Sequence, residues 1–188
     1  MACLVCRLPG DGCLCPSCHS TLAPAAECWI DGLLVRSVFR HEGAARRIVH
    51  LLKYSGVVPP GIGRVLADRL PAGAQALMPV PRVMLRRWRY GVDPALELAR
   101  AASRVSGIPV SMALSPPAWV RRRAGGAGAR RGQARFRLQG PVPPGVVLVD
   151  DVVTTGNTLL AAAAATGASV AVTLTSAVRP SSDDAGRG

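Results

Sequence analysis

Lysine is almost absent from this sequence: among its 23 basic residues, Lys53 is the only one that is not an arginine. Acidic residues are also few, 11 in a chain of 188, so the formal net charge is +12. An excess of this size favours polyanions, either nucleic acid or a phosphorylated small molecule, without choosing between them. Aromatic residues make up 4% of the chain, which leaves few side chains for stacking on bases. The length suits one compact α/β domain with a small appendage, and its core must be built from Ala, Val and Leu.

Long apolar runs are missing too, so no membrane-spanning helix is predicted. The nearest candidate, residues 159–178, is interrupted by Gly167 and predicts a helix, a turn and a strand. The first residues, MACLVCRLPGDG, lack the charged leader and apolar stretch of a secretory signal. We therefore expect no membrane insertion and a cytoplasmic location, where clustered cysteines more often bind metal than form disulfides.

All six cysteines lie in the first 30 residues, a segment rich in Pro and Gly that shows no clear periodicity. Two C-x-x-C pairs separated by eight residues are typical of a structural zinc site, in which the metal replaces the core that so short a segment cannot build. The expected ligands are Cys3, Cys6, Cys15 and Cys18. Cys13 or His19 could replace one of them, and reduced cysteines without metal remain the alternative.

Periodicity predicts alternating helices and strands after this segment. We expect two helices within residues 39–70, divided by 56–63, a buried strand at 76–82, a helix at 94–105 and a strand at 108–114. His41 and His50 are expected to be surface or capping residues, because neither has a second ligand at metal spacing.

Two basic segments follow strands in this scheme. The stretch 76–82 ends in a Pro-Val-Pro loop, which is followed by Arg82, Arg86, Arg87 and Arg89. Seven arginines and no acid occur from Trp119 through Arg137, which predicts either a mobile loop or a solvated basic surface.

The stretch VVLVDDVVTTGNT, residues 146–158, carries the clearest chemistry. Val146 to Val149 predict a central parallel strand, and a helix to about Thr166 should follow the turn. A glycine, hydroxyl groups and free N–H groups at a helix start form a concavity suited to phosphate. Asp150 and Asp151 would repel phosphate and must instead address hydroxyl groups or a divalent cation. A sugar phosphate meets both demands, whereas simple helix capping is the alternative.

These residues resemble the ribose-phosphate-binding signature of type I phosphoribosyltransferases, along the whole length of the stretch. The remaining chain resembles the ComF family of competence-associated, phosphoribosyltransferase-like proteins. That resemblance is carried by the C-x-x-C pairs, LLKYSG at 51–56, PVP at 79–81 and, loosely, RYGVDP at 89–94.

The resemblance implies a type I phosphoribosyltransferase fold with a mainly parallel five-stranded sheet, plus a small N-terminal zinc-binding module. It further implies binding of 5-phosphoribosyl 1-pyrophosphate with Mg²⁺ and transfer of the phosphoribosyl group to an acceptor. Asp150 and Asp151 would hold the ribose hydroxyls and act in catalysis, and Arg82 would face pyrophosphate. The 5-phosphate would be bound by Val153, Thr154, Thr155, Gly156, Asn157 and Thr158.

The alternative function is a single-stranded DNA-binding accessory of DNA uptake, with other DNA-uptake proteins as possible partners. In either case we expect a zinc module at 1–30, a phosphoribosyltransferase-like domain at 31–180 and a disordered tail at 181–188. The arginine-rich loop 121–131 would close over pyrophosphate in the enzyme or would contact DNA phosphates in the alternative.

Overall fold

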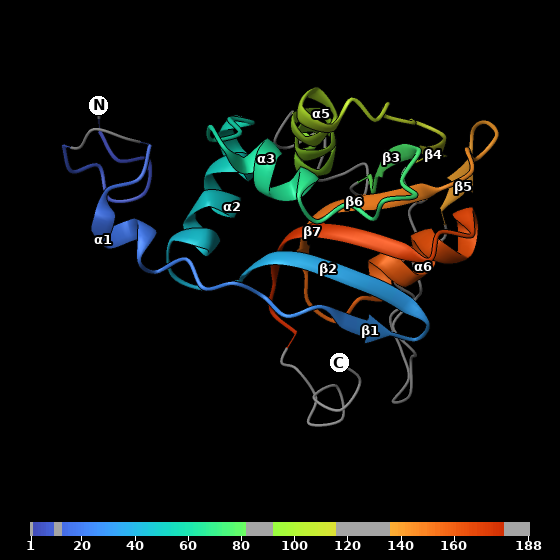
Figure 1. Ribbon diagram of the computed structural model, residues 1–188, viewed down its shortest axis with the longest axis horizontal. Coiled ribbons are helices and arrows are strands. Elements are labelled where there is room, and N and C mark those ends of the chain that lie inside the picture. The colour runs from blue at the N-terminus through green and yellow to red at the C-terminus, as the bar shows by residue number, and fades with distance from the viewer. Residues whose placement is uncertain (1, 10–12, 82–91, 116–135, 179–188) are drawn as a thin grey trace, which may run out of the picture.

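A mostly parallel five-stranded sheet forms the centre of the computed structural model, which describes residues 2–9, 13–81, 92–115 and 136–178 (Figure 1). The strand order is β1-β2-β7-β6-β3, and only the pair β1–β2 is antiparallel. The strands are β1 (Cys28–Ile30), β2 (Leu33–Arg40), β3 (Ala76–Pro79), β6 (Val146–Val153) and β7 (Val170–Ser176). The expected α/β class with a mainly parallel five-stranded sheet is therefore confirmed.

Three helices cover one face of the sheet, as Figure 1 shows. They are α2 (Gly43–Ser55), α3 (Ile62–Ala67) and α5 (Pro94–Ser106). Ile48 and Leu52 of α2 and Leu98 of α5 are buried against strand residues of β3, β6 and β7. Gly63 allows α3 to pass close to α5, because a Cβ atom there would clash with the backbone of Ala101.

The opposite face is covered by α6 (Asn157–Thr166), whose Leu159 and Ala162 pack on Leu148 and Ala171 of the central strands. A short antiparallel ribbon, β4 (Leu114–Ser115) with β5 (Arg137–Leu138), lies beside this cluster. Both faces of β6 are thus covered, which explains its continuous apolar run.

The N-terminal segment carries the cysteines and the short helix α1 (Pro16–His19), and it lies beside α2 (Figure 1). Two backbone hydrogen bonds join the segment that follows to β2, from Ala25 N–H to Val38 O and from Arg40 N–H to Ala23 O. The last three residues of the expected module, Cys28–Ile30, form β1 and belong to the main sheet.

Several boundaries differ from the expected ones. The region assigned to helices from residue 39 begins with the end of β2, and the first helix starts only at Gly43. Within the expected strand 108–114, the structure has an isolated bridge from Val110 to Leu77 and then β4 from Leu114. β6 continues to Val153, so both aspartates lie inside the strand rather than after it. Short-range patterns missed these points because pairing with distant strands decides them.

Candidate functional site

The four expected zinc ligands converge on one point. The Sγ atoms of Cys3, Cys6, Cys15 and Cys18 all lie within 4.8 Å of one another. Those of Cys6 and Cys15 are 3.6 Å apart, and ligands about 2.3 Å from a tetrahedral zinc would be separated by nearly this distance. The four cysteines therefore form a cluster that could bind a metal ion such as zinc, and a complete thiolate shell leaves no position for water.

The two residues considered as substitute ligands are not part of this cluster. The thiol of Cys13 faces the carbonyl oxygen of Pro60 at 4.0 Å, and His19 ends α1. Within the cluster the thiols differ in pKa. A hydrogen bond from the backbone of Cys6 is the main cause that lowers the pKa of Cys3 to about 6. Burial, followed by the neighbouring thiols, raises the pKa of Cys18 to about 12.

The second candidate site is the turn from β6 into α6. Gly156 stands immediately before the helix with φ at +76°, a conformation that side chains rarely adopt. A Cβ atom there would lie 2.8 Å from Cδ1 of Ile30 in β1, so the turn is packed against the sheet edge. Asp150, Val152 and residues 153–159 line a hollow of about 30 Å³, which includes every residue expected to bind the 5-phosphate.

The first N–H groups of α6 lie at this turn, and α6 has no side-chain cap. Such groups are unsatisfied within the helix and carry its positive dipole end, which favours an anion. The simple capping role considered for Asp151 and Thr154 is therefore not seen. The size of the hollow matches a single small group rather than a whole nucleotide.

The two aspartates do not point the same way, because successive side chains of a strand alternate between its faces. Asp150 is half-buried, lines the hollow, and its Oδ1 accepts a hydrogen bond of 2.7 Å from the backbone N–H of Asp151. Asp151 is buried on the side of α2, where its Oδ2 lies 3.4 Å from Nζ of Lys53. Asp150 thus lines the hollow at the β6–α6 turn, whereas Asp151 connects the sheet to α2 through its ion pair with Lys53.

Asp151 also belongs to a hydrogen-bonded network with His41. The hydroxyl of Thr175 donates to the carbonyl oxygen of Asp151 at 3.3 Å, and Nδ1 of His41 lies 2.8 Å from the same hydroxyl. The tautomer of the His41 ring decides which of these two groups donates in the second bond. Burial, then the charges of Lys53 and Arg46, lower the pKa of His41, and Asp151 opposes them.

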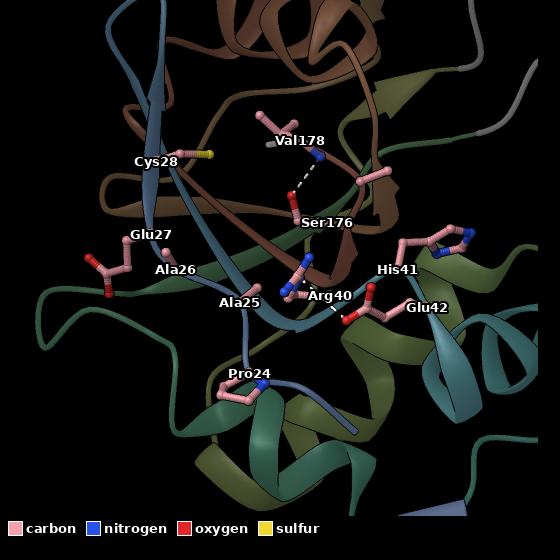
Figure 2. A pocket seen from close by; sticks show the side chains of 11 residues that line it. Pro24, Ala25, Ala26, Glu27, Cys28, Arg40, His41, Glu42, Ser176 and Val178 are labelled. Atoms are coloured by element: carbon pink, nitrogen blue, oxygen red, sulfur yellow. Dashed lines mark hydrogen bonds and ion pairs between the residues drawn. The ribbon is translucent and has the colours of Figure 1, made fainter. Parts of the chain in front are cut away.

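A larger hollow, about 440 Å³, lies where β2 and β7 end (Figure 2). Segments 24–28, 40–42 and 176–178 line it, and Arg40 pairs with Glu42 at 3.4 Å within it. Ser176 Oγ there accepts a hydrogen bond from the backbone of Val178. The side chains therefore largely satisfy one another.

Sequence reasoning missed Lys53 and His41 as members of the site. The one available signal was that the only lysine of the chain stands in LLKYSG. Arg82, the loop 121–131 and the tail 181–188 lie outside the described residues. Among the described residues, the four cysteines are the only group of three or more potential metal ligands.

No protein-family model matches this chain, and no curated protein is significantly similar to it. Within the described ranges, none of the helices has the length and apolar character needed to cross a bilayer.

Proposed function

We propose that the protein is a ComF-like phosphoribosyltransferase that binds 5-phosphoribosyl 1-pyrophosphate at the β6–α6 turn. The observation that supports the proposal most directly is the arrangement of this turn. A glycine with positive φ, an uncapped helix start and one aspartate surround a hollow the size of a single small group.

In the proposed complex, the N–H groups and hydroxyls of residues 154–158 bind the 5-phosphate. The carboxylate of Asp150 lies at the same hollow and binds a ribose hydroxyl group. Asp151 acts from the other face of β6, since Lys53 holds its carboxylate. Its role is to fix the strand end and to supply negative charge beneath the site.

Transfer breaks the bond between the anomeric carbon and pyrophosphate and forms a bond from that carbon to the acceptor. Positive charge develops on the ribose in the transition state, and the Asp150 carboxylate stabilises it. One carboxylate beside a ligand phosphate is a donor set that Mg²⁺ accepts, so Asp150 would hold the ion together with the ligand. The ion would neutralise charge on the departing pyrophosphate. Arg82 would face that group.

The zinc module has a structural role in this proposal. Its cysteines fill the metal shell and are separate from the β6–α6 turn in the fold (Figure 1).

The test is calorimetric titration of the zinc-loaded protein with phosphoribosyl pyrophosphate and Mg²⁺. Saturable binding should be lost in Asp150→Asn. It should persist in Asp68→Asn, which removes an exposed carboxylate paired with Arg64 on α3. No binding by the folded wild type would refute the proposal.

The alternative, single-stranded DNA binding, is supported by the net charge of +12. It predicts that replacing Arg121 to Arg123 lowers the affinity for an oligonucleotide and makes its salt dependence less steep. The proposed enzyme predicts that these replacements affect pyrophosphate release instead.

A further inference from the structure

A third hollow, of about 460 Å³ and lined by basic side chains, lies along α2, and its arginines and His50 have no part in the proposed reaction. Its size falls within the range of small-molecule sites. Among the described residues, its lining holds no carboxylate. The lining consists of His41, Gly43, Arg46, Arg47, Val49, His50 and Lys53.

The geometry of α2 explains how these side chains gather. Arg46, His50 and Lys53 follow one another at spacings of four and three residues, so they share one face of the helix over about 10 Å. Val49 is buried and forms an apolar base, whereas Arg46 and His50 are exposed. The ring of His50 packs against that of Tyr54 at 4.4 Å between centroids, which orients the imidazole.

The charges of this hollow are only partly neutralised within the described structure. Arg40 and Arg64, outside the hollow, pair with Glu42 and Asp68. Inside it, the ion pair that the structure shows is that of Lys53 with Asp151. Like charges held close together favour a multivalent anion that can contact several of them at once.

We propose that the α2 hollow binds the diphosphate group of a small phosphorylated molecule, and that Lys53 is shared between this ligand and Asp151. The volume favours a small molecule over a nucleic acid strand, which needs an extended groove. The arginines provide forked donors suited to phosphate oxygens. Because an anion competes with Asp151 for Lys53, occupancy of the hollow changes the electrostatic environment of β6. Binding in the hollow does not depend on the proposed phosphoribosyl transfer.

Histidine side-chain NMR tests this proposal with inorganic pyrophosphate as the probe. The chain has three histidines, of which His41 and His50 line the hollow and His19 lies in the cysteine module. We expect saturable shifts of the His41 and His50 ring signals and none for His19. Shifts of all three signals alike, or of none in the folded protein, would overturn the proposal.

Paired variants locate the binding. The double variant Arg46→Ala, Arg47→Ala should weaken pyrophosphate binding roughly tenfold or more, which is about 1.4 kcal/mol. The control Arg64→Ala, Arg104→Ala removes the same charge from α3 and α5 and should leave the affinity within about twofold. Equal losses in both would show only general charge attraction and would overturn the proposal. Shifts caused by an oligonucleotide but not by pyrophosphate would also overturn it.

This test separates the hollow from the proposed enzyme site. Phosphoribosyl pyrophosphate also carries a diphosphate, so its binding at the β6–α6 turn is measured in the Arg46→Ala, Arg47→Ala variant. Adding Asp150→Asn to that variant should abolish the binding. With Arg46 and Arg47 intact, the histidine signals of Asp150→Asn should still respond to inorganic pyrophosphate. If phosphoribosyl pyrophosphate fails to bind at that turn and the histidine response persists, the proposed function fails and the hollow stands.

Discussion

The ion pair between Lys53 and Asp151 should stabilise the fold more than a surface pair does. This expectation depends on how far the two side chains are exposed to solvent: that of Asp151 is 9% exposed and that of Lys53 is 35% exposed. Removing one partner of a fully buried pair costs about 3–5 kcal/mol, whereas exposed pairs contribute about 0.2–1 kcal/mol. Solvent reaches Lys53, so we expect a coupling energy of about 1–2 kcal/mol.

The assay is a double-mutant cycle with Lys53→Met and Asp151→Asn, measured by urea unfolding of the zinc-loaded protein at pH 7. Each single variant should be destabilised, and the double variant should be more stable than the sum of the two losses implies. Because α2 holds Lys53 over the sheet, the coupling should change little between low and moderate salt.

The pair Arg64–Asp68 provides the control cycle. It is shorter, 3.1 Å against 3.4 Å, but its side chains are 73% and 59% exposed. Its coupling energy should therefore stay below about 0.5 kcal/mol. If the two cycles give the same coupling, or if the shorter pair couples more strongly, burial is not what strengthens Lys53–Asp151 and the reasoning is refuted.

Three further predictions concern the turn, the histidine and the metal. Gly156→Ala should lower the free energy of unfolding by about 1–2 kcal/mol and weaken phosphate binding. Gly167→Ala, with similar φ but open space around it, should lower only the free energy of unfolding. Urea unfolding and titration with phosphate compare the two variants. Burial and Lys53 lower the pKa of His41, so its contribution to stability is complete above about pH 6.5 and decreases as the pH falls below it. NMR titration should show Lys53→Met raising that pKa, and an unchanged value would contradict the stated cause. Chelating zinc should remove hydrogen-exchange protection from residues 2–22 while the sheet stays protected; simultaneous loss would show that the two units are not independent.

Local patterns predicted the elements whose signals lie within a few residues. The apolar run of Val146 to Val149 predicted a covered strand, and Gly167 predicted the end of α6, as the structure shows. The spacing of the cysteines predicted the cluster for the same reason, since each C-x-x-C pair is one tight turn.

What the sequence could not provide were contacts between distant segments. The strand of Leu33 to Arg40 was not foreseen, because its register depends on β7, more than a hundred residues later. Lys53 gave no local sign of its partner, since Asp151 reaches it only when α2 packs on the sheet. The opposite orientation of Asp150 and Asp151 required knowing that β6 extends through both.

The position of β7 also constrains how the chain can fold during its synthesis. β7 lies between β2 and β6 in the sheet, yet of the strands in the described residues it is the last to leave the ribosome. The hydrogen bond between the hydroxyls of Ser37 and Thr173, which are 136 residues apart, cannot form until β7 has been synthesised. At about 5–20 residues per second, the chain from Arg40 to Val170 takes roughly 7–26 s to synthesise, and β2 lacks its neighbour β7 for that time. The cysteine module, synthesised before these strands, can close around its metal during that interval. A chain truncated before residue 170 would instead expose the edges of β2 and β6 to aggregation.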